Sequence, residues 1–358
     1  MKAIFRVDAS LVMGIGHVMR CLTLAKVLKE NGVKVKFICR KHKGNLISKI
    51  RSNGFDVCEI GMVGQIKVNS ELKNYNLLGV TQLQDAKDCI DILNKEKVNW
   101  IITDHYALDE IWHMIIRPYA QKIMVIDDLA DRRFNCDVLL NQNLGSQLED
   151  YENKVPNGCN LLLGCEYALL RPEFKELRGQ ALEKRKNTKK IKNILISMGG
   201  SDIENITYDV LQQLDSNFNV VVVLGGASPH NVMIENYGKD KNIKVIVNAD
   251  NMAELMLEAD LSIGASGSTN WERLCLGLPS LIFTVAENQI KFSKILDELG
   301  LIRLLGHVGE RKAINVIKES ILSIDDLSAW SERCFNSCSC DGVSKVVEII
   351  TNKSVSIA

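Results

Sequence analysis

The sequence has no surplus of charge of either sign and no long apolar run. It contains 44 Lys and Arg and 44 Asp and Glu among 358 residues, a formal net charge of zero. Without a basic surplus there is no general attraction to nucleic acid or to an anionic membrane. No window approaches the roughly 20 apolar residues of a membrane helix, and Arg6 and Asp8 interrupt the opening stretch before it resembles a signal peptide. We therefore expect a cytoplasmic protein without nucleic-acid or membrane partners.

The pattern of a disulfide framework or a metal site is also missing. The 11 cysteines are scattered and odd in number, in a chain too large to need disulfide support. Cys334, Cys338 and Cys340 form the one local cluster, and no fourth ligand follows it. His17, Asp104 and His105 show no metal-ligand spacing on one element. We expect free thiols, no metal and no cofactor.

Apolar strands alternate with amphipathic segments, which predicts an α/β fold with parallel sheets covered by helices. The first series of strands is expected at Ala3–Val7, Val33–Cys39, Val98–Thr103, Lys122–Ile126, Val138–Leu140 and Leu161–Leu163. A second series is expected at Asn193–Ser197, Asn219–Leu224, Ile243–Val247, Leu261–Ile263 and Ser280–Thr284. Two doubly wound, Rossmann-like domains facing each other across a cleft are the predicted architecture.

The predicted boundary lies in a basic, polar stretch. Residues 178–190, RGQALEKRKNTKK, have no apolar stripe and suggest an exposed linker or the exposed end of a helix. The N-terminal domain is therefore expected over 1–177 and the C-terminal domain over 191–358. Val343–Ile350 has helical spacing and can pack on either domain. The sequence does not indicate an oligomeric state.

The loop after the first predicted strand carries the most distinctive motif. Gly14 and Gly16 allow a tight turn that brings amides close to a ligand, and His17 follows directly. The third glycine of a dinucleotide fingerprint is absent, so the loop is weak evidence for NAD. At a helix N-terminus the macrodipole disfavours added positive charge, so His17 is expected to stay neutral and able to accept a proton from water. It could instead cap the helix or bind phosphate.

Two loops of the second half suggest a diphosphate site. Gly199 and Gly200 follow its first strand and can open a helix. The loop Gly264–Thr269, with Ser266, Gly267, Ser268 and Thr269, combines hydroxyls with free backbone amides. Glu272, one helical turn later, is suitably placed for ribose hydroxyls. A plain Gly/Ser turn with an exposed Glu is the alternative.

Polar residues also end two strands of the first half. Asp104, His105 and Tyr106 could line a sugar pocket, and Asp127 and Asp128 end the next strand; one Asp of each pair could only cap a helix. The histidines without motif context are assigned to surface or packing, namely His42, His113, His230 and His307.

Taken together, these motifs resemble the UDP-2,4-diacetamido-2,4,6-trideoxy-β-L-altropyranose hydrolases of pseudaminic acid biosynthesis. The resemblance spans nearly the whole chain, through Phe5–Ser10, Gly14–Ala25, Ile102–Tyr106, Ile126–Asp128, Met198–Asp202 and Asn288-Gln289. It implies the GT-B fold and kinship with the transferase that adds N-acetylglucosamine to the lipid-linked peptidoglycan precursor. It also implies His17 as the catalytic base, Glu272 as the ribose-binding residue, and a substrate site including Asp8, Asn288 and Gln289.

The implied reaction is metal-independent hydrolysis of the UDP-sugar to UDP and free sugar. His17 takes a proton from water as water attacks the anomeric carbon with inversion, and UDP is a good leaving group that needs no acid. A glycosyltransferase with the same donor is the nearest alternative; no exposed apolar helix is evident near the glycine loop, which favours water over an acceptor. A non-catalytic nucleotide-sugar-binding subunit is the other alternative.

Overall fold

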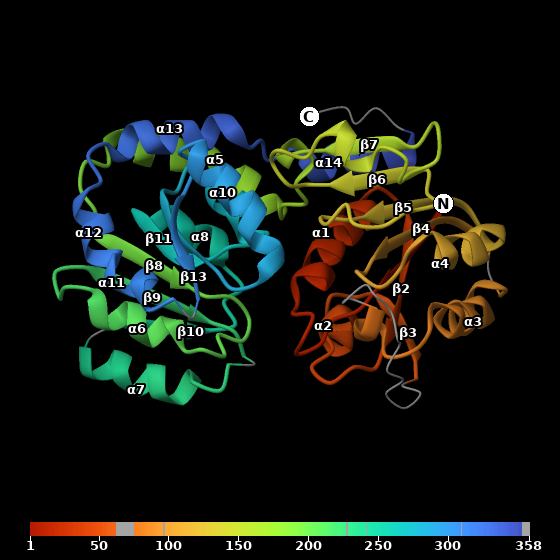
Figure 1. The fold of residues 1–358 in the computed structure, drawn as a ribbon, viewed down its shortest axis with the longest axis horizontal. Coiled ribbons are helices and arrows are strands. Elements are labelled where there is room, and N and C mark those ends of the chain that lie inside the picture. The colour runs from red at the N-terminus through yellow and green to blue at the C-terminus, as the bar shows by residue number, and fades with distance from the viewer. Residues whose placement is uncertain (62–74, 96, 227, 242, 309, 353–358) are drawn as a thin grey trace. The chain divides into compact units, whose positions relative to one another are not determined.

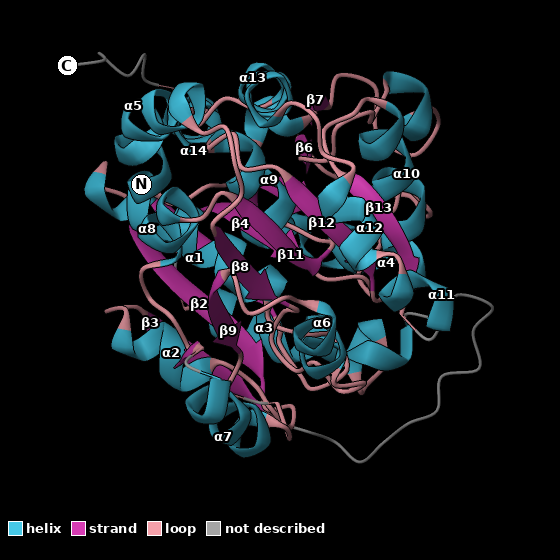
Figure 2. Cartoon of the chain, turned by 90° about the vertical axis from the view of Figure 1, so that its left-hand side faces the viewer, coloured by secondary structure: helices cyan, strands magenta, loops and turns pink. Residues whose placement is uncertain are grey.

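The computed structural model describes residues 1–61, 75–95, 97–226, 228–241, 243–308 and 310–352. The chain folds into two units (Figure 1): unit 1 comprises Met1–Leu169 together with the segment that begins at Asp341, and unit 2 comprises Leu170–Cys340. Each unit is an α/β body with one parallel sheet, as the alternating sequence pattern predicts. Helices accompany the strands of both sheets (Figure 2).

The described part of unit 1 contains a seven-stranded sheet in the order β3-β2-β1-β4-β5-β6-β7. Its strands are β1 (Lys2–Val7), β2 (Lys34–Arg40), β3 (Asp56–Ile60), β4 (Val98–Asp104), β5 (Ala120–Ile126), β6 (Val138–Asn141) and β7 (Asn160–Leu163). Its helices are α1 (Gly16–Glu30), α2 (Ile47–Ser52), α3 (Gln82–Leu93), α4 (Glu110–Ile116) and α14 (Gly342–Thr351), with 3-10 turns η1 (Tyr75–Leu78), η2 (Arg117–Tyr119), η3 (Leu148–Tyr151) and η4 (Cys165–Tyr167).

In unit 2 the described residues form a six-stranded sheet in the order β10-β9-β8-β11-β12-β13. Its strands are β8 (Asn193–Ser197), β9 (Asn219–Leu224), β10 (Lys244–Val247), β11 (Leu261–Ala265), β12 (Ser280–Thr284) and β13 (Arg303–His307). Its helices are α5 (Pro172–Asn187), α6 (Ile206–Gln213), α7 (Asn231–Lys241), α8 (Met252–Glu258), α9 (Thr269–Cys275), α10 (Ile290–Glu298), α11 (Arg311–Asn315), α12 (Ile317–Leu322) and α13 (Leu327–Ser337), with the 3-10 turn η5 (Glu287–Gln289).

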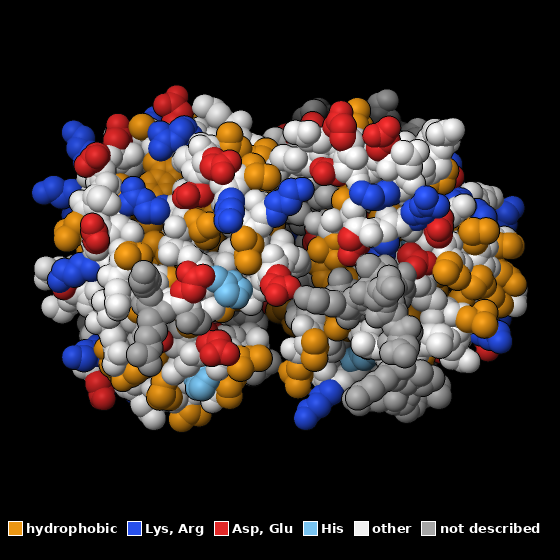
Figure 3. Space-filling view, viewed as in Figure 1, with side chains coloured by type: hydrophobic (Ala, Val, Ile, Leu, Met, Phe, Trp, Pro, Cys, Tyr) orange, Lys and Arg blue, Asp and Glu red, His pale blue; other side chains and the backbone are white. Residues whose placement is uncertain are grey.

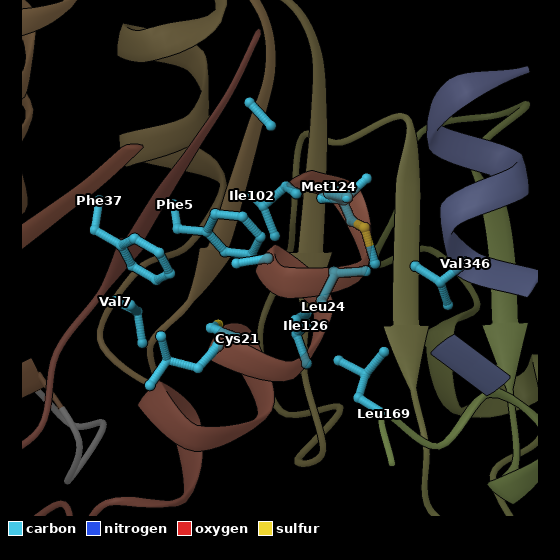
Figure 4. Packing of buried hydrophobic residues seen from close by; sticks show 14 of the residues in the cluster. Phe5, Val7, Cys21, Leu24, Phe37, Ile102, Met124, Ile126, Leu169 and Val346 are labelled. Carbon is cyan, nitrogen blue, oxygen red and sulfur yellow. The ribbon is translucent and has the colours of Figure 1, made fainter. Parts of the chain in front are cut away.

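Every ladder in both sheets is parallel, which explains the continuous apolar runs in the strands. All residues of β11 and of β12 are buried, because helices cover the sheet on both faces. The core of unit 1 has the same character: Phe5 of β1 stacks on Phe37 of β2 at 4.9 Å between ring centroids. Figure 4 shows these rings with Leu24 of α1 and Val346 of α14 in the same cluster.

The C-terminal helix belongs to unit 1, not to the predicted C-terminal domain over 191–358. Val346 and Val347 of α14 are buried in the unit 1 core, and Trp100 of β4 donates its indole N–H to the carbonyl of Ile350 at 3.0 Å. The close approach requires Gly342, because a Cβ there would lie 2.4 Å from the carbonyl oxygen of Ala168. The sequence left this helix open to either domain, since its apolar stripe fits both cores.

The basic stretch 178–190 forms the second half of α5 and the residues that follow it, and it is packed on unit 2. Arg178 donates to the carbonyl of Phe335 at 2.7 Å, and Arg185 donates to that of Met256 at 2.7 Å. Lys184 donates to the Leu257 carbonyl at 3.0 Å. These cations satisfy carbonyls that helix C-termini leave unpaired. The boundary between the units therefore falls at 169/170 rather than at 177 and 191.

Cys275, at the end of α9, forms a disulfide with Cys340. This corrects the expectation that all thiols are free; the other cysteines in the described chain form no disulfide. The two residues are 65 positions apart, so no local spacing in the sequence indicates the pair.

Each sheet reverses its strand order at one place, which positions the loops of interest. In unit 1 the reversal lies between β1 and β4, and in unit 2 between β8 and β11. Crevices outside the carboxyl ends of strands at such switch points are the usual ligand sites of open α/β sheets. The loop with His17 follows β1, Asp104 ends β4, and the loops with Gly199 and Gly267 follow β8 and β11.

Candidate functional site

His17 is the second residue of α1 and lies at the switch point of unit 1. Its side chain is 9% exposed, and its Nδ1 lies 3.7 Å from Oδ1 of Asp104. Nδ1 is buried without a hydrogen-bond partner in the described chain. The Tyr106 ring packs edge-on against the imidazole, with 4.5 Å between ring centroids. This packing orients the ring plane, and the distance to Asp104 places the Nδ1 edge of the imidazole on the side of the carboxylate.

The imidazole of His17 is held neutral. Burial lowers its pKa from the usual value, and the Asp104 carboxylate opposes this only in part. The sequence predicts a neutral His17 from the helix dipole; the direction agrees, and desolvation is the main cause in the structure. A neutral ring with its Nδ1 edge toward a carboxylate favours the tautomer with the proton on Nδ1 and a lone pair on Nε2.

The glycine loop before His17 is open to solvent. Gly14 has φ +76° and donates its amide to the Ser10 carbonyl at 2.9 Å, so the turn needs glycine there. Both Gly14 and Gly16 are exposed, and a Cβ at either position would meet nothing within 4 Å. The loop also exposes apolar side chains, Leu11 at 48%, Val12 at 82% and Ile15 at 40%. This apolar surface beside the glycine loop was not expected from the sequence.

Asp104 is fully enclosed and paired with a residue that the sequence analysis missed. Arg20 donates Nε and Nη2 to the two oxygens of Asp104, each at 2.7 Å, and Nη1 to Asp128 at 3.1 Å. Arg20 follows His17 by three positions, so both side chains lie on one face of α1. This spacing could have indicated that Arg20 lies beside His17. The predicted role of Asp104 in sugar binding is not favoured by its 0% exposure; its contacts support the base instead.

Asp8 is enclosed in the same way. Its carboxylate is 2.7 Å from Nη1 of Arg6 and accepts the backbone amide of Arg40 at 2.7 Å. The Nε2 atoms of His42 and His105 both lie 3.4 Å from Asp8 Oδ2. Burial alone would raise the pKa of Asp8, but the Arg6 charge and these imidazoles hold it well below its ordinary value. With 1% exposure, Asp8 ties the ends of β1, β2 and β4 together rather than facing a substrate.

His105 is a donor in this cluster. Its Nδ1 accepts the backbone amide of Ala107 at 3.0 Å, so a neutral ring carries its proton on Nε2, toward Asp8. Burial lowers the pKa of His105, which keeps the ring neutral. His42 was assigned to surface or packing; its side chain is buried and belongs to the Asp8 cluster.

The loop after β11 divides into an inner and an outer part. Ser266 is 5% exposed, and its Oγ is 2.6 Å from that of Ser293, so the predicted phosphate contact by this hydroxyl is not favoured. Ser268 is exposed, and Gly267 and Thr269 are half-buried. Gly267 has φ +144°, a conformation that favours glycine. The outer residues therefore keep their polar groups accessible.

Glu272 lies one turn into α9, on the same side as this loop. Its side chain is 20% exposed and 3.5 Å from Nη2 of Arg171. Burial raises its pKa, and the Arg171 charge opposes the rise. A carboxylate with one long ion pair retains acceptor sites for the hydroxyl groups of a ligand.

The loop after β8 was expected to lead directly into a helix, and the structure does not show this. Gly199 is exposed and has φ +87°. Gly200 lies close to Gly225, because a Cβ added to Gly225 would be 2.0 Å from the Gly200 carbonyl oxygen. The next helix begins only at Ile206. Asp202 accepts the amides of Ile206 at 2.9 Å and of the following residue at 3.1 Å. Asp202 therefore occupies the helix N-terminus that was expected to face a phosphate.

Asn288 and Gln289 lie in η5, after β12, next to the β11 loop. Asn288 is exposed, and Gln289 accepts the amide of Val285 at 2.8 Å through Oε1. The Nε2 of Gln289 is 4.0 Å from the Cβ position of Gly267. The structure thus brings together the outer β11 loop, Gln289 and Glu272 within unit 2.

In the part of the chain that the structure describes, no group of three or more His, Cys, Asp or Glu side chains is arranged to hold a metal ion. No helix of the described residues has the length and apolarity to cross a membrane. On the face shown in Figure 3, acidic and basic side chains are interspersed, in line with their equal numbers.

Comparison with known proteins extends over both units. Residues 174–300 match the model of the glycosyltransferase family 28 C-terminal domain. The crystal structure of Acinetobacter baumannii MurG superposes with a TM-score of 0.66 at 15% identity, covering 98% of this chain and 99% of that one. At this identity the likeness establishes the fold. The two parallel sheets and this likeness define an α/β protein with the GT-B fold. At the general level, its relatives support an enzyme.

Sequence relatives specify the family. A UDP-2,4-diacetamido-2,4,6-trideoxy-β-L-altropyranose hydrolase of Campylobacter jejuni is 29% identical over 273 residues, 75% of this chain and 87% of that protein. A spore coat polysaccharide biosynthesis protein of Bacillus subtilis is 32% identical over 249 residues, 57% of this chain and 72% of that protein. The chain belongs to the family of the UDP-2,4-diacetamido-2,4,6-trideoxy-β-L-altropyranose hydrolases.

Some relatives are longer than the matched region. An uncharacterized protein of Methanocaldococcus jannaschii is 32% identical over 303 residues, which cover 81% of this chain and 57% of that protein. The chain therefore spans little more than half the length of this relative.

Proposed function

We propose that the protein hydrolyses a UDP-linked 2,4-diacetamido-2,4,6-trideoxy sugar, of the β-L-altropyranose type, to UDP and the free sugar in pseudaminic acid biosynthesis. The observation that carries the proposal is His17: a neutral imidazole at the switch point of unit 1, with Nδ1 on the side of Asp104 at 3.7 Å. The names of the Campylobacter jejuni relative and of a Helicobacter pylori relative support the substrate. A cytoplasmic location and the absence of a cofactor are parts of the proposal.

In the proposed reaction His17 Nε2 accepts a proton from water while the water oxygen forms a bond to the anomeric carbon. The bond between that carbon and the β-phosphate oxygen breaks, and UDP leaves with the electron pair. UDP is a stable anion, so no carboxylic acid has to protonate it, unlike the leaving groups of ordinary glycosidases. General-base assistance of this kind contributes roughly 10²–10⁴-fold.

Unit 2 is proposed to bind the nucleotide. The accessible groups of Gly267, Ser268 and Thr269 suit a diphosphate, because backbone amides and hydroxyls can satisfy phosphate oxygens without lysine. Glu272 is proposed to accept the ribose hydroxyls. Asn288, Gln289, Gly199 and Gly200 are proposed to contact the nucleotide in unit 2. In unit 1, Gly14, Gly16 and Tyr106 are proposed to contact the sugar.

A glycosyltransferase is the second candidate, and one observation favours it. Leu11, Val12 and Ile15 expose apolar side chains on the loop before His17, where an apolar acceptor would have to bind. A non-catalytic UDP-sugar-binding subunit is the third candidate, and it would leave the neutral imidazole of His17 without a use.

One experiment separates the three. The purified protein is incubated with a panel of UDP-amino sugars without any acceptor, and UDP and the sugar anomers are followed by NMR. Hydrolysis predicts stoichiometric UDP and free sugar, first formed as the inverted anomer, with the diacetamido trideoxy substrate. UDP release only after an acceptor is added would indicate the transferase. Tight binding without release under all conditions would indicate the binding subunit.

A further inference from the structure

Five side chains of unit 1 form a cluster that includes the proposed base. His17 Nδ1 faces Asp104 at 3.7 Å, and Asp104 is held by Arg20 through two bonds of 2.7 Å. Arg20 also donates to Asp128 at 3.1 Å. Burial and the Asp128 carboxylate raise the pKa of Tyr106, whose ring packs edge-on against His17. Arg20 is the member that joins the two carboxylates.

The two carboxylates of this cluster and Arg20 come from different elements, so the geometry of the cluster depends on Arg20. Arg20 lies on α1, Asp104 ends β4, and Asp128 follows β5. A guanidinium has a planar fork that can bind one carboxylate with two parallel bonds and still donate to a second; an ammonium is a point charge without this geometry. Arg20 is 7% exposed and both Asp104 oxygens are its acceptors, so solvent takes little part in the arrangement.

Charge balance gives Arg20 a second effect. An opposite charge within about 4–6 Å typically shifts a pKa by 1–3 units, so Asp104 alone would favour the protonated imidazole. The charged and titratable groups that face His17 are Asp104, Asp128, Arg20 and His105, with Tyr106 against the ring. Among them Arg20 supplies the positive charge that offsets the carboxylates.

We propose that Arg20 is a positioning residue for the base: it fixes Asp104 and Asp128 behind His17 and offsets their charge, so that the ring stays neutral with its Nδ1 proton toward Asp104. The charge and tautomer of His17 can be measured without turnover, and only the catalytic consequence rests on the proposed function. Arg20 itself touches no reacting atom in this account.

The test is an NMR titration of His17 in protein with isotope-labelled histidine, assigned by comparison with H17N. In R20M the carboxylates are uncompensated, and the His17 pKa is expected to rise by one unit or more. In D104N the negative charge is removed while Arg20 stays, so the His17 pKa is expected to fall. The tautomer with the proton on Nδ1 is then expected to be favoured less. R20K, which keeps the charge, is expected to restore the pKa but to leave the Nδ1-protonated form less dominant.

Matched controls separate this role from general destabilisation. Arg132 makes a comparable buried pair with Asp127, at 3.2 Å from Nη2 to Oδ1, and R132K is expected to leave the His17 titration unchanged. If R20M does not fold, the weaker preference for the Nδ1-protonated form in R20K still decides. A His17 pKa within 0.3 unit of wild type in folded R20M, or an unchanged Nδ1 preference in R20K, would overturn the proposal.

Kinetics then test the catalytic consequence separately. If the enzyme hydrolyses the UDP-sugar, R20M should lose about tenfold or more in kcat/KM at pH 6 and recover to within a few-fold of wild type at pH 8.5. A uniform loss at both pH values would make Arg20 merely structural. If the pKa shifts occur but no substrate is turned over, the proposed function fails while the role of Arg20 stands.

Discussion

Asp104 Oδ1 lies 3.7 Å from Nδ1 of His17, while both Asp104 oxygens accept bonds from Arg20. The carboxylate is thus close enough to orient the imidazole, yet the Arg20 guanidinium largely neutralises its charge. Burial would raise the pKa of Asp104, but Arg20 and His17 keep it below its ordinary value, so it stays ionised. This arrangement suits a base that must begin each cycle neutral.

Replacing His17 tests its role as base. H17N and H17A are expected to lower kcat by about 10²–10⁴-fold, because water then has no positioned proton acceptor. Binding of UDP, measured by calorimetry, is expected to stay within a few-fold of wild type, since the proposed nucleotide contacts lie in unit 2. Near-normal turnover in either variant would remove His17 from this role.

The pH profile reports the charge of the base. Burial lowers the pKa of His17, so the ring stays unprotonated to a lower pH than a solvated histidine, and only the unprotonated ring accepts a proton. We expect kcat/KM to be constant near neutrality and to fall only below about pH 6.5, the ordinary histidine value. The profile is measured over the range in which circular dichroism shows a folded protein. A limb centred above 6.5 would contradict the lowered pKa.

Glu272 is expected to recognise ribose. E272Q keeps the size of the side chain but removes the ionised acceptor, so affinity for UDP should fall by about tenfold, as for one lost charge-assisted hydrogen bond of 1.5 kcal/mol or so. Affinity for 2′,3′-dideoxy-UDP should change little. E254Q alters an exposed acid on α8 and serves as the matched control. Equal losses for both nucleotides would place Glu272 elsewhere in the site.

His113 should make unit 1 sensitive to acid. Burial, aided by nearby Arg132 and Arg117, lowers its pKa to about 3, below the value of about 6.5 in an unfolded chain. Between these values the unfolded state binds one more proton, so the free energy of unfolding falls as the pH falls, by about 1.4 kcal/mol per unit.

The corresponding variant is H113Q, which retains a polar group near Thr103. Urea denaturation between pH 4 and 7 is expected to show a slope of unfolding free energy against pH that is smaller than in wild type by about one proton. Comparison is made at equal m-values, so that a change in the unfolded state is not mistaken for the effect. Equal slopes would indicate that His113 is protonated in the folded protein.

The strands and the positions of the loops were predictable because parallel strands leave strong apolar signals. All predicted strands are present, whereas β3 and β13 were missed. β13, Arg303–His307, contains charged and polar residues and is only half-buried, so its apolar signal is weak. The basic half of α5 was missed as part of a packed helix because Arg178 and Arg185 bind carbonyls that are distant in sequence.

The sequence predicted which residue types lie at which strand ends, and it was less informative about where their side chains point. Asp8 and Asp104 stand at strand ends as expected, but both point into buried ionic clusters whose partners, Arg6 and Arg20, are fixed only by the fold. Ser266 likewise turns inward to Ser293. A one-residue change of direction within a loop decides whether a hydroxyl faces solvent or the core, and single-sequence patterns carry no such information.

The most direct test of the account is hydrolysis of the diacetamido trideoxy UDP-sugar in H₂¹⁸O, with products read by mass spectrometry within minutes, before the free sugar exchanges its anomeric oxygen. Attack at the anomeric carbon predicts one ¹⁸O atom in the sugar and none in UDP, and H17N should give far less labelled sugar in the same time. Label in a phosphate of the nucleotide, or release of UMP and sugar phosphate, would show that a P–O bond breaks and would contradict the account.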